Sequence, residues 1–447
     1  MASAEEGYWV KPLSRPESAH ADLASIVFVG DFYLEPAPET RSVSDLAASP
    51  VIDALRGASA AIVNLEGPLA GSGEPIPKVG SHMSQDRTAP GLLAAMGFDV
   101  ACLANNHIMD YGLPALVDTV RACSQSGVLT VGAGVDARQA AAPVRLETPG
   151  GRPVRVLSFC EREFNVGEDG AGAAWVSSPE AERLVRSAAA EGDLVVVCAH
   201  GGQMDVPFPP VQRCRQLRRF VDAGADLVIG HHPHVPQGWE SWRGRFIFYS
   251  LGDFLFGSAV RAQKPNRDWG LLVRALAGDG GIEGLQVLPV ERAGRGVAFI
   301  SDEGRLRACT EYLLRLSAIT PGDALVPYWQ EVAVRLTEGT YCRVLEDAVI
   351  GTPGRQPRRG VRLHRTVWLL RRILDLWFAK GRGPEPALIG PASERQWPRL
   401  LNALRCESHR WAMETALEVL GGQCEDRRSP DVAADVADLL AWRRPGP

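Results

Sequence analysis

Three of the chain's nine histidines fall within four residues, in the segment Gly230-His231-His232-Pro233-His234. This segment follows the mainly apolar run 225–229, which predicts a buried strand that ends at a glycine. Loops at the carboxyl ends of strands face the crevice where open α/β sheets bind their ligands. The pattern therefore predicts a metal site, and the alternative is a solvated, histidine-rich turn. We favour the metal site because other candidate ligands also follow predicted strands.

Strand-like and helix-like patterns alternate from residue 25 to about residue 277, which is typical of an α/β fold. The predicted strands cover 25–29, 60–64, 100–103, 154–159, 194–199, 226–229, 245–250 and 271–275. Predicted helices between them cover 113–125, 179–190 and 211–223. Five of the strands end directly in a polar cluster, and we expect these clusters to meet at one edge of the sheet.

Composition excludes several classes of protein. The 447-residue chain is 45% hydrophobic and 23% charged, as expected for a globular protein of one or two domains. A net charge of -5 does not indicate nucleic-acid binding. The nine cysteines are scattered, without a C-x-x-C pair, and are expected to be reduced. The first ten residues contain Glu5 and Glu6 and do not resemble a signal peptide. Without a run of about 18 apolar residues, we expect a cytoplasmic protein with no membrane span.

The polar clusters together supply oxygen and nitrogen ligands of the kind that divalent metals use. The candidates that follow predicted strands are Asp31, Glu66, Asn106, His200, His232 and His234. Carboxylate, amide and imidazole donors suit two first-row cations such as Mn²⁺, Zn²⁺ or Fe. Two such cations activate a bridging water and clamp the oxygens of an in-line displacement, most often at a phosphoester. For Glu66 alone, a surface acid in the turn before Pro68 is the alternative.

Taken in order, these clusters resemble the bacterial CapA family, also called the poly-γ-glutamate capsule synthesis family. The resemblance covers roughly residues 24–277. The stretches that carry it are Val29-Gly30-Asp31, Asn64-Leu65-Glu66-Gly67-Pro68, Leu103-Ala104-Asn105-Asn106-His107-Ile108-Met109-Asp110-Tyr111-Gly112, Val131-Gly132-Ala133-Gly134, His200-Gly201-Gly202, Gly230-His231-His232-Pro233-His234 and Phe248-Tyr249-Ser250-Leu251-Gly252-Asp253-Phe254. The family looks like a divergent branch of the calcineurin-like metallophosphoesterases, so the resemblance implies a four-layer α/β sandwich of two sheets flanked by helices.

The resemblance also implies roles for individual residues. The first cation is held by Asp31 and His234, the second by Asn106, His200 and His232, and Glu66 bridges the two. His107 then lies near the substrate and protonates the leaving oxygen. Asp110, three residues further on, orients His107.

Several residues depart from the family pattern. The broader superfamily has a histidine where this chain has Tyr33, which predicts a weaker first metal site. Asp253 replaces the usual asparagine of the Ser-Leu-Gly-Asn-Phe stretch, and Met204 and Asp205 stand where relatives often carry a glutamate and an aromatic residue. We predict a substrate pocket around Asn64, Asn105, Glu161, Glu163 and His231. For Glu161 and Glu163, a charged surface turn is an equal alternative.

The chain changes character after residue 300. We predict an N-terminal extension over 1–23, a CapA-like domain over 24–300 and a mainly helical region over 301–447. Helices are predicted over 303–316, 328–336, 366–380 and 397–420, with a polar helix and a frayed end over 421–447. The segment 352–365 is rich in arginine, proline and glycine; we favour a solvated linker there over a site for an anionic partner.

These patterns predict a metal-dependent, phosphoesterase-like hydrolase that works in capsule, poly-γ-glutamate or related polymer or secondary-metabolite biosynthesis. Its substrate is expected to be an anionic small molecule or polymer, and a partner from a biosynthetic complex is compatible with the sequence. One alternative is a non-catalytic accessory subunit of a γ-glutamyl polymer or amide-forming complex. Another is an interaction protein that docks a partner through its basic linker and C-terminal helices.

Overall fold

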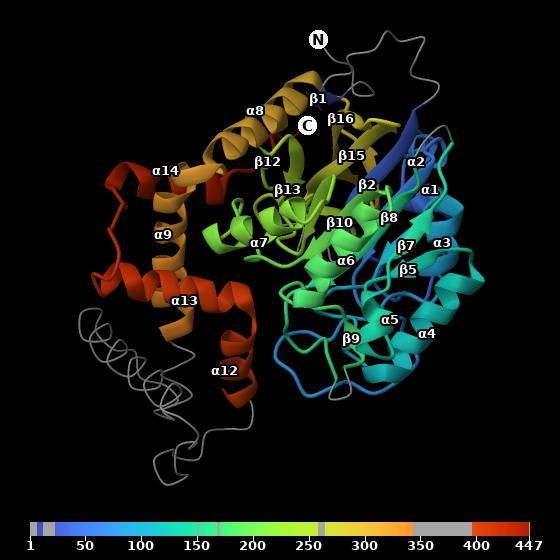
Figure 1. Ribbon diagram of the computed structural model, residues 1–447, viewed down its shortest axis with the longest axis horizontal. Coiled ribbons are helices and arrows are strands. Elements are labelled where there is room, and N and C mark those ends of the chain that lie inside the picture. The colour runs from blue at the N-terminus through green and yellow to red at the C-terminus, as the bar shows by residue number, and fades with distance from the viewer. Residues whose placement is uncertain are drawn as a thin grey trace. The chain divides into compact units, whose positions relative to one another are not determined.

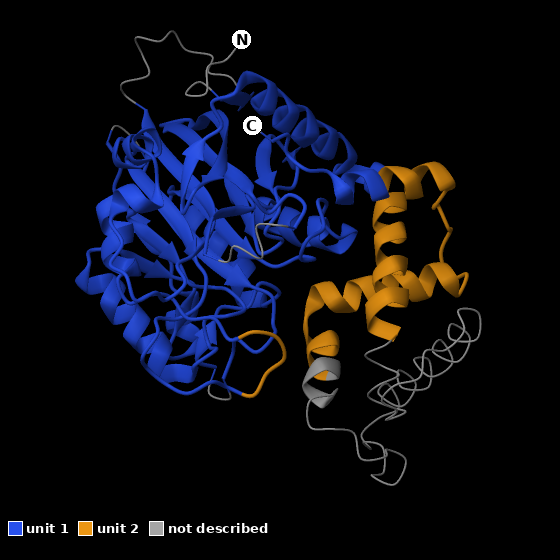
Figure 2. Ribbon diagram, turned by 180° about the vertical axis from the view of Figure 1, so that it is seen from behind, with its two compact units in different colours: residues 1–76, 82–325, 437–447 blue, residues 77–81, 326–436 orange. Residues whose placement is uncertain are grey.

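The computed structural model describes residues 7–11, 23–149, 152–167, 170–257, 264–342 and 396–446. The chain forms two compact units (Figure 2). Unit 1 contains residues 1–76, 82–325 and 437–447, and unit 2 contains residues 77–81 and 326–436. The candidate ligands all belong to unit 1.

The larger sheet of unit 1 has nine strands. Along its main path the order is β1-β16-β15-β2-β3-β4-β5, with β14 paired to β2 and β17 to β16. The bounds are β1 Tyr8–Lys11, β2 Ala24–Tyr33, β3 Ala60–Leu65, β4 Val100–Cys102, β5 Leu129–Val131, β14 Asp253–Phe256, β15 Trp269–Gly278, β16 Gly281–Ala293 and β17 Gly296–Phe299. Strands β14, β2, β3, β4 and β5 run parallel, whereas β15, β16, β17 and β1 pair antiparallel. The carboxyl ends of the parallel strands therefore share one edge.

The smaller sheet has six strands in the order β12-β13-β11-β10-β8-β7. The bounds are β7 Val144–Leu146, β8 Val154–Cys160, β10 Leu194–His200, β11 Leu227–His231, β12 Trp239–Trp242 and β13 Arg245–Phe248. Its four central strands are parallel, and β7 and β12 add antiparallel edges. A separate two-stranded ribbon joins β6 (Ala133–Gly134) to β9 (Gly172–Ala173).

Helices cover the outer face of each sheet. The hydrophobic core of the larger sheet joins Val27 and Val29 of β2 to Leu46, Val51 and Leu93 from the helices packed on it. These helices are α1 (Val43–Leu46), α2 (Ser49–Arg56), α3 (Ala89–Met96) and α4 (Gly112–Gln125), and α5 (Ala137–Ala141) follows them. Figure 1 shows α6 (Pro179–Ala190) and α7 (Val211–Asp222) over the smaller sheet, where they contact β10 and β11.

The two sheets pack on each other through the faces that these helices leave free. Side chains alternate between the two faces of a strand, so Ile26 and Phe28 of β2 point away from the helices that cover Val27 and Val29. Contacts between β2 and β11, and between β5 and β8, join the sheets. Strands that are buried on both faces consist of nearly continuous apolar residues. This is why the sequence pattern predicts β2, β3 and β10.

The structure confirms the predicted two-sheet α/β architecture with a C-terminal helical region, and each of the eight predicted strands is present. The single helix predicted over 397–420 is wrong. Cys406 has extended backbone angles (φ -68°, ψ 125°), and these separate α12 (Gln396–Arg405) from α13 (Glu407–Leu420). The helix predicted over 366–380 and the arginine-rich segment 352–365 lie outside the described residues.

The helix predicted within 421–447 is present, but the frayed end predicted after it is wrong. Helix α14 (Pro430–Ala441) is followed by Trp442, whose ring stacks on that of Tyr312 with centroids 4.1 Å apart. Arg444 then forms an ion pair with Asp268 at 2.8 Å. Tyr312 belongs to α8 (Glu303–Ile319), so side-chain packing fixes the end of the chain to unit 1.

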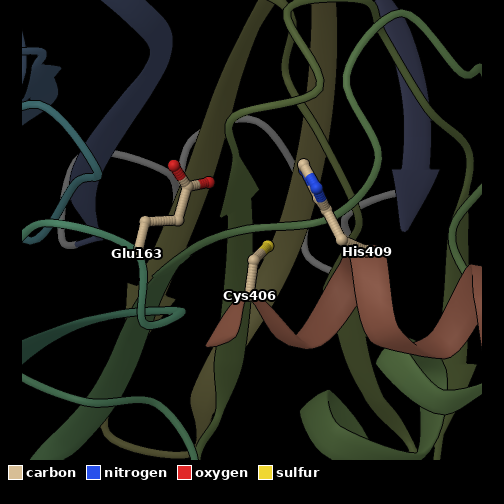
Figure 3. Close-up of side chains that lie close together, drawn as sticks. All are labelled: Glu163, Cys406 and His409. Carbon is tan, nitrogen blue, oxygen red and sulfur yellow. The ribbon is translucent and has the colours of Figure 1, made fainter. Parts of the chain in front are cut away.

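Unit 2 is a helical unit built from α9 (Leu325–Leu336), α12, α13 and part of α14. The indole of Trp329, which is buried, donates a hydrogen bond to Thr415 on α13 at 3.1 Å. The hydroxyl of Tyr328 donates to Asp435 on α14 at 2.7 Å. At the start of α13, Cys406 and His409 lie one helical turn apart (Figure 3). Within the described ranges, no helix combines the length and the apolar character needed to cross a membrane.

Candidate metal centre

The carboxyl ends of five strands from both sheets meet at the candidate site. Asp31 lies near the end of β2, Glu66 directly follows β3, and the segment 105–107 follows β4. From the smaller sheet, His200 is the last residue of β10, and the segment 231–234 begins at the end of β11. The candidate ligands are therefore held by strand termini of two packed sheets.

Asp31 lies at the centre of this cluster and is completely buried. Its oxygens accept hydrogen bonds from the Asn64 side chain at 2.7 Å and from the backbone amide of His232 at 3.1 Å. Burial by itself raises the pKa of Asp31, but the neighbouring imidazoles of His231 and His234 outweigh it and hold the pKa well below its usual range. The carboxylate is therefore ionised, as a metal ligand must be.

One half of the cluster is rich in imidazole, and we call Asn106, His200 and His232 the imidazole half. The Nε2 atom of His200 lies 3.1 Å from Oδ1 of Asn106 and 3.1 Å from Nδ1 of His232. Burial and the adjacent His232 lower the pKa of His200 well below its ordinary value. A neutral imidazole is the form that binds metals.

The other half is rich in carboxylate, and we call Asp31, His234 and Asp253 the carboxylate half. The Nδ1 atom of His234 lies 2.8 Å from Oδ1 of Asp253 and 3.4 Å from Oδ2 of Asp31. Its Nε2 atom lies 3.6 Å from Oε1 of Glu66, which is completely buried. Ligand atoms of Asp31, Glu66 and His200 also lie within 4.8 Å of one another, so Glu66 and Asp31 connect the two halves.

His107 lies beside this cluster and is held by Asp110. Its Nδ1 atom is 2.7 Å from Oδ2 of Asp110, and its Nε2 atom is 3.9 Å from Oε1 of Glu66. Asp110 is buried and also accepts a hydrogen bond from the backbone amide of Met83. The His107 side chain remains 12% exposed, whereas the Asp110 side chain is almost fully buried.

The loops that carry the histidines have unusual backbone angles. His232 and His234 have φ values of 97° and 58°, a region that costs of order 1–3 kcal/mol for a residue other than glycine. Such strain persists where the surroundings fix the chain, and it concentrates at functional sites. These backbone angles place the His234 imidazole beside Asp31 and the His232 imidazole beside His200.

Glu161 has a supporting position behind the loop that follows His200. Its Oε1 atom accepts a hydrogen bond from the amide of Gly202 at 3.1 Å and lies 3.5 Å from Nη1 of the buried Arg213. A Cβ atom at Gly201 would come within 2.6 Å of the Glu161 side chain, which requires glycine there. Glu161 therefore fixes the course of the loop.

The remaining candidates for the substrate pocket take different places. Asn64 lies between Asp31 and His200, and His231 has its Nδ1 atom 3.3 Å from Asp31. Asn105 accepts from the amide of Gly67, and so ties the loop after β4 to the loop after β3. Glu163 lies in the loop after β8 and is half-buried (Figure 3).

Asp253 is the residue that sequence reasoning noted only as a departure from the family pattern. It begins β14, which pairs in parallel with β2 so that Asp253 lies opposite Asp31. The available signal was the carboxylate itself, directly after Leu251-Gly252 in a stretch that otherwise matches the family. The pairing of β14 with β2, which the sequence does not reveal, brings it to the site.

Buried imidazoles and carboxylates contributed by two packed sheets define an α/β protein with a candidate metal centre at its strand ends. The family model described as "Bacterial capsule synthesis protein PGA_cap" matches residues 25–258, more than half of the 447-residue chain. The chain belongs to this family.

Curated relatives place the family in capsule and polyglutamate synthesis. The chain is 34% identical to "PGA biosynthesis protein CapA" of Bacillus subtilis over 39% of this chain and 47% of the relative. It is 31% identical to "Capsule biosynthesis protein CapA" of Bacillus anthracis over 47% of this chain and 51% of the relative. For "Probable polyglutamine synthesis accessory protein Rv0574c" of Mycobacterium tuberculosis, identity is 33% over 36% of this chain and 46% of the relative. The matches span about half the length of these relatives.

Proposed function

We propose that the protein is a metal-dependent hydrolase that acts on a phosphoester or phosphoanhydride of an anionic substrate in the synthesis of a capsule or related polymer. The observation that carries the proposal is the convergence of mostly buried donors at the strand ends, with neighbouring donor atoms 2.8–3.4 Å apart. Ligands about 2.1 Å from one cation have such separations. The names of the capsule and polyglutamate relatives supply the biological setting.

The donor set suits two divalent cations such as Mn²⁺, Zn²⁺ or Fe. In the proposed assignment Asp31 and His234 would hold the first cation, and Asn106, His200 and His232 would hold the second. Glu66 would serve both, in keeping with its position between the two halves. When bound, the cations would supply Lewis-acid chemistry: activation of water as a nucleophile at neutral pH and stabilisation of charge on the phosphoryl group.

The protein's own residues have distinct tasks in this reaction. Asp110 accepts from Nδ1 of His107, which fixes the ring and leaves Nε2 to hold the proton that the leaving oxygen takes. Asn64 donates to Asp31 and keeps that carboxylate oriented. Glu161, which lies beside Arg213, accepts a hydrogen bond from Gly202 and so holds the glycine loop after His200 in place.

A second candidate function is a non-catalytic accessory subunit of a polymer-forming complex. Two observations favour it: the relatives from Mycobacterium tuberculosis are named accessory proteins, and Tyr33 stands where the broader superfamily has a histidine. A protein of this kind would use the bound metal to shape a docking surface and would hydrolyse no phosphoester.

Metal-dependent hydrolysis by the full-length protein separates the two functions. Chelator-treated protein is reloaded with Mn²⁺, Zn²⁺ or Fe²⁺ and assayed on bis(p-nitrophenyl) phosphate and on inorganic pyrophosphate. We expect hydrolysis only after reloading, its loss in His200→Ala, and its retention in the matched control His82→Ala, whose imidazole bonds the carbonyl of Ile76 instead. Two tightly bound cations with no hydrolysis of either probe would favour the accessory function.

A further inference from the structure

Strand β2 brings a carboxylate but no imidazole to the carboxylate half. Asp31 and Tyr33 are two residues apart on this strand and so share a face. The ring of Tyr33 packs against Phe256, with centroids 5.1 Å apart. A phenol with a pKa near ~10 is protonated at neutral pH and is a poor ligand. From β2 the carboxylate half therefore gains one oxygen ligand and no imidazole.

A carboxylate from the adjacent strand lies where a further ligand is needed. Asp253 is buried and lies opposite Asp31 in the parallel pairing of β14 with β2. Its Oδ1 atom is 2.8 Å from Nδ1 of His234, and that nitrogen is 3.4 Å from Oδ2 of Asp31. Ligand atoms of the three residues lie within 4.8 Å of one another, as is required of side chains that share one cation.

We propose that Asp253 is itself a ligand of the first cation and takes the place that Tyr33 leaves open. This inference rests on the proposed metal centre. It gives the two cations different sets of ligands. The first cation would have the carboxylates of Asp31, Asp253 and Glu66 with one imidazole, from His234. The second would have the imidazoles of His200 and His232 with oxygens from Asn106 and Glu66.

The unequal donor sets predict unequal metal preferences. Carboxylates are hard ligands that suit Mn²⁺, whereas imidazole suits Zn²⁺. Zn²⁺ binds a given site of this type more tightly than Mn²⁺, so the measurable quantity is the ratio of the two affinities. We expect the Zn²⁺-to-Mn²⁺ affinity ratio to be about tenfold smaller at the first site than at the second.

A simpler role for Asp253 is that of a positioning residue that accepts a hydrogen bond from His234. The substitution Asp253→Asn separates the two roles, because an asparagine oxygen still accepts this bond but provides a much weaker ligand. If Asp253 is a ligand, Asp253→Asn should weaken Mn²⁺ binding at one site by about 10²-fold or more and leave the other site unchanged. The exposed Asp279, in the turn between β15 and β16, provides the matched control Asp279→Asn.

The experiment is a calorimetric titration of Mn²⁺, and separately of Zn²⁺, into the full-length, metal-free protein. Wild type and Asp279→Asn should bind two cations with different Zn²⁺-to-Mn²⁺ ratios. Asp253→Asn should lose the site with the smaller ratio, and Tyr33→His added to it should restore a second site with a larger ratio. Two sites in Asp253→Asn with wild-type affinities would overturn the inference. Equal Zn²⁺-to-Mn²⁺ affinity ratios at the two wild-type sites would also overturn the inference. This second result does not require any variant to fold. Failure of the wild type to bind metal would instead overturn the proposed function.

Discussion

The two halves of the cluster draw most of their donors from different sheets, although His234 of the carboxylate half follows β11 and Asn106 of the imidazole half follows β4. In the imidazole half, His200 and His232 come from β10 and β11 of the smaller sheet. In the carboxylate half, Asp31 and Asp253 come from the adjacent strands β2 and β14 of the larger sheet. Each sheet thus supplies one kind of donor, and Glu66 connects them. In the proposed assignment, the absence of an imidazole at Tyr33 is offset by Asp253 on the hydrogen-bonded neighbouring strand.

The halves also differ in how their ligands are held. Asp31 and Asp253 lie within strands, where the sheet fixes the backbone. His232 and His234 lie in a loop with positive φ angles, and Pro233 between them restricts its motion. The positions of the histidines therefore depend on supporting contacts, such as the bond from the His232 amide to Asp31.

The largest effect is expected from the double substitution His232→Ala with His234→Ala, which removes one imidazole from each half. Metal affinity should fall by well over ~10²-fold at both sites, since loss of supporting contacts alone costs 10–100-fold. Elemental analysis after dialysis measures the bound metal, with His82→Ala as the control. Unchanged metal content in the double variant would contradict the assignment of His232 and His234 as metal ligands.

The next largest effect is expected from His107→Asn, because His107 lies beside the cluster without belonging to either half. Turnover should fall by about 10²–10⁴-fold, the usual contribution of general acid–base catalysis. Metal content should remain that of the wild type. Steady-state kinetics measure the turnover, and elemental analysis measures the bound metal. A loss of metal would show that His107 is a ligand and belongs to one of the two halves.

A smaller effect is expected from Tyr33→His alone, which tests whether the carboxylate half is already complete. If Asp253 fills the open place, a new imidazole should tighten the first site by no more than about tenfold. The imidazole half should not change. Calorimetric titration measures this; a gain of many orders of magnitude would show that the wild-type carboxylate half lacks a ligand.

The sequence predicted the parts of this molecule whose signal is local. Apolar runs such as 26–29 and 194–199 predict buried strands because both of their faces are covered. Strand β16 escaped prediction although it has 13 residues, because glycine, proline and glutamate interrupt its apolar pattern. Helices α1 and α5 have only four and five residues, too few to show a helical period.

The candidate site was predictable to the extent that its residues follow strands directly. Asp31, His200 and His232 could be identified in this way, and the structure brings them together. The position of Asp253 depends on the pairing of β14 with β2, between residues more than 200 positions apart, and no local pattern encodes that pairing. The same holds for the contact of Glu161 with Arg213.

The most direct test of the account is anomalous diffraction from crystals of the full-length protein grown with Mn²⁺ or Zn²⁺. We expect two anomalous peaks about 3.5–4 Å apart, the usual spacing of two-metal sites. One peak should lie beside Asp31, His234 and Asp253, the other beside Asn106, His200 and His232, with Glu66 between them. A single peak remote from these residues, or none at saturating metal, would contradict the account.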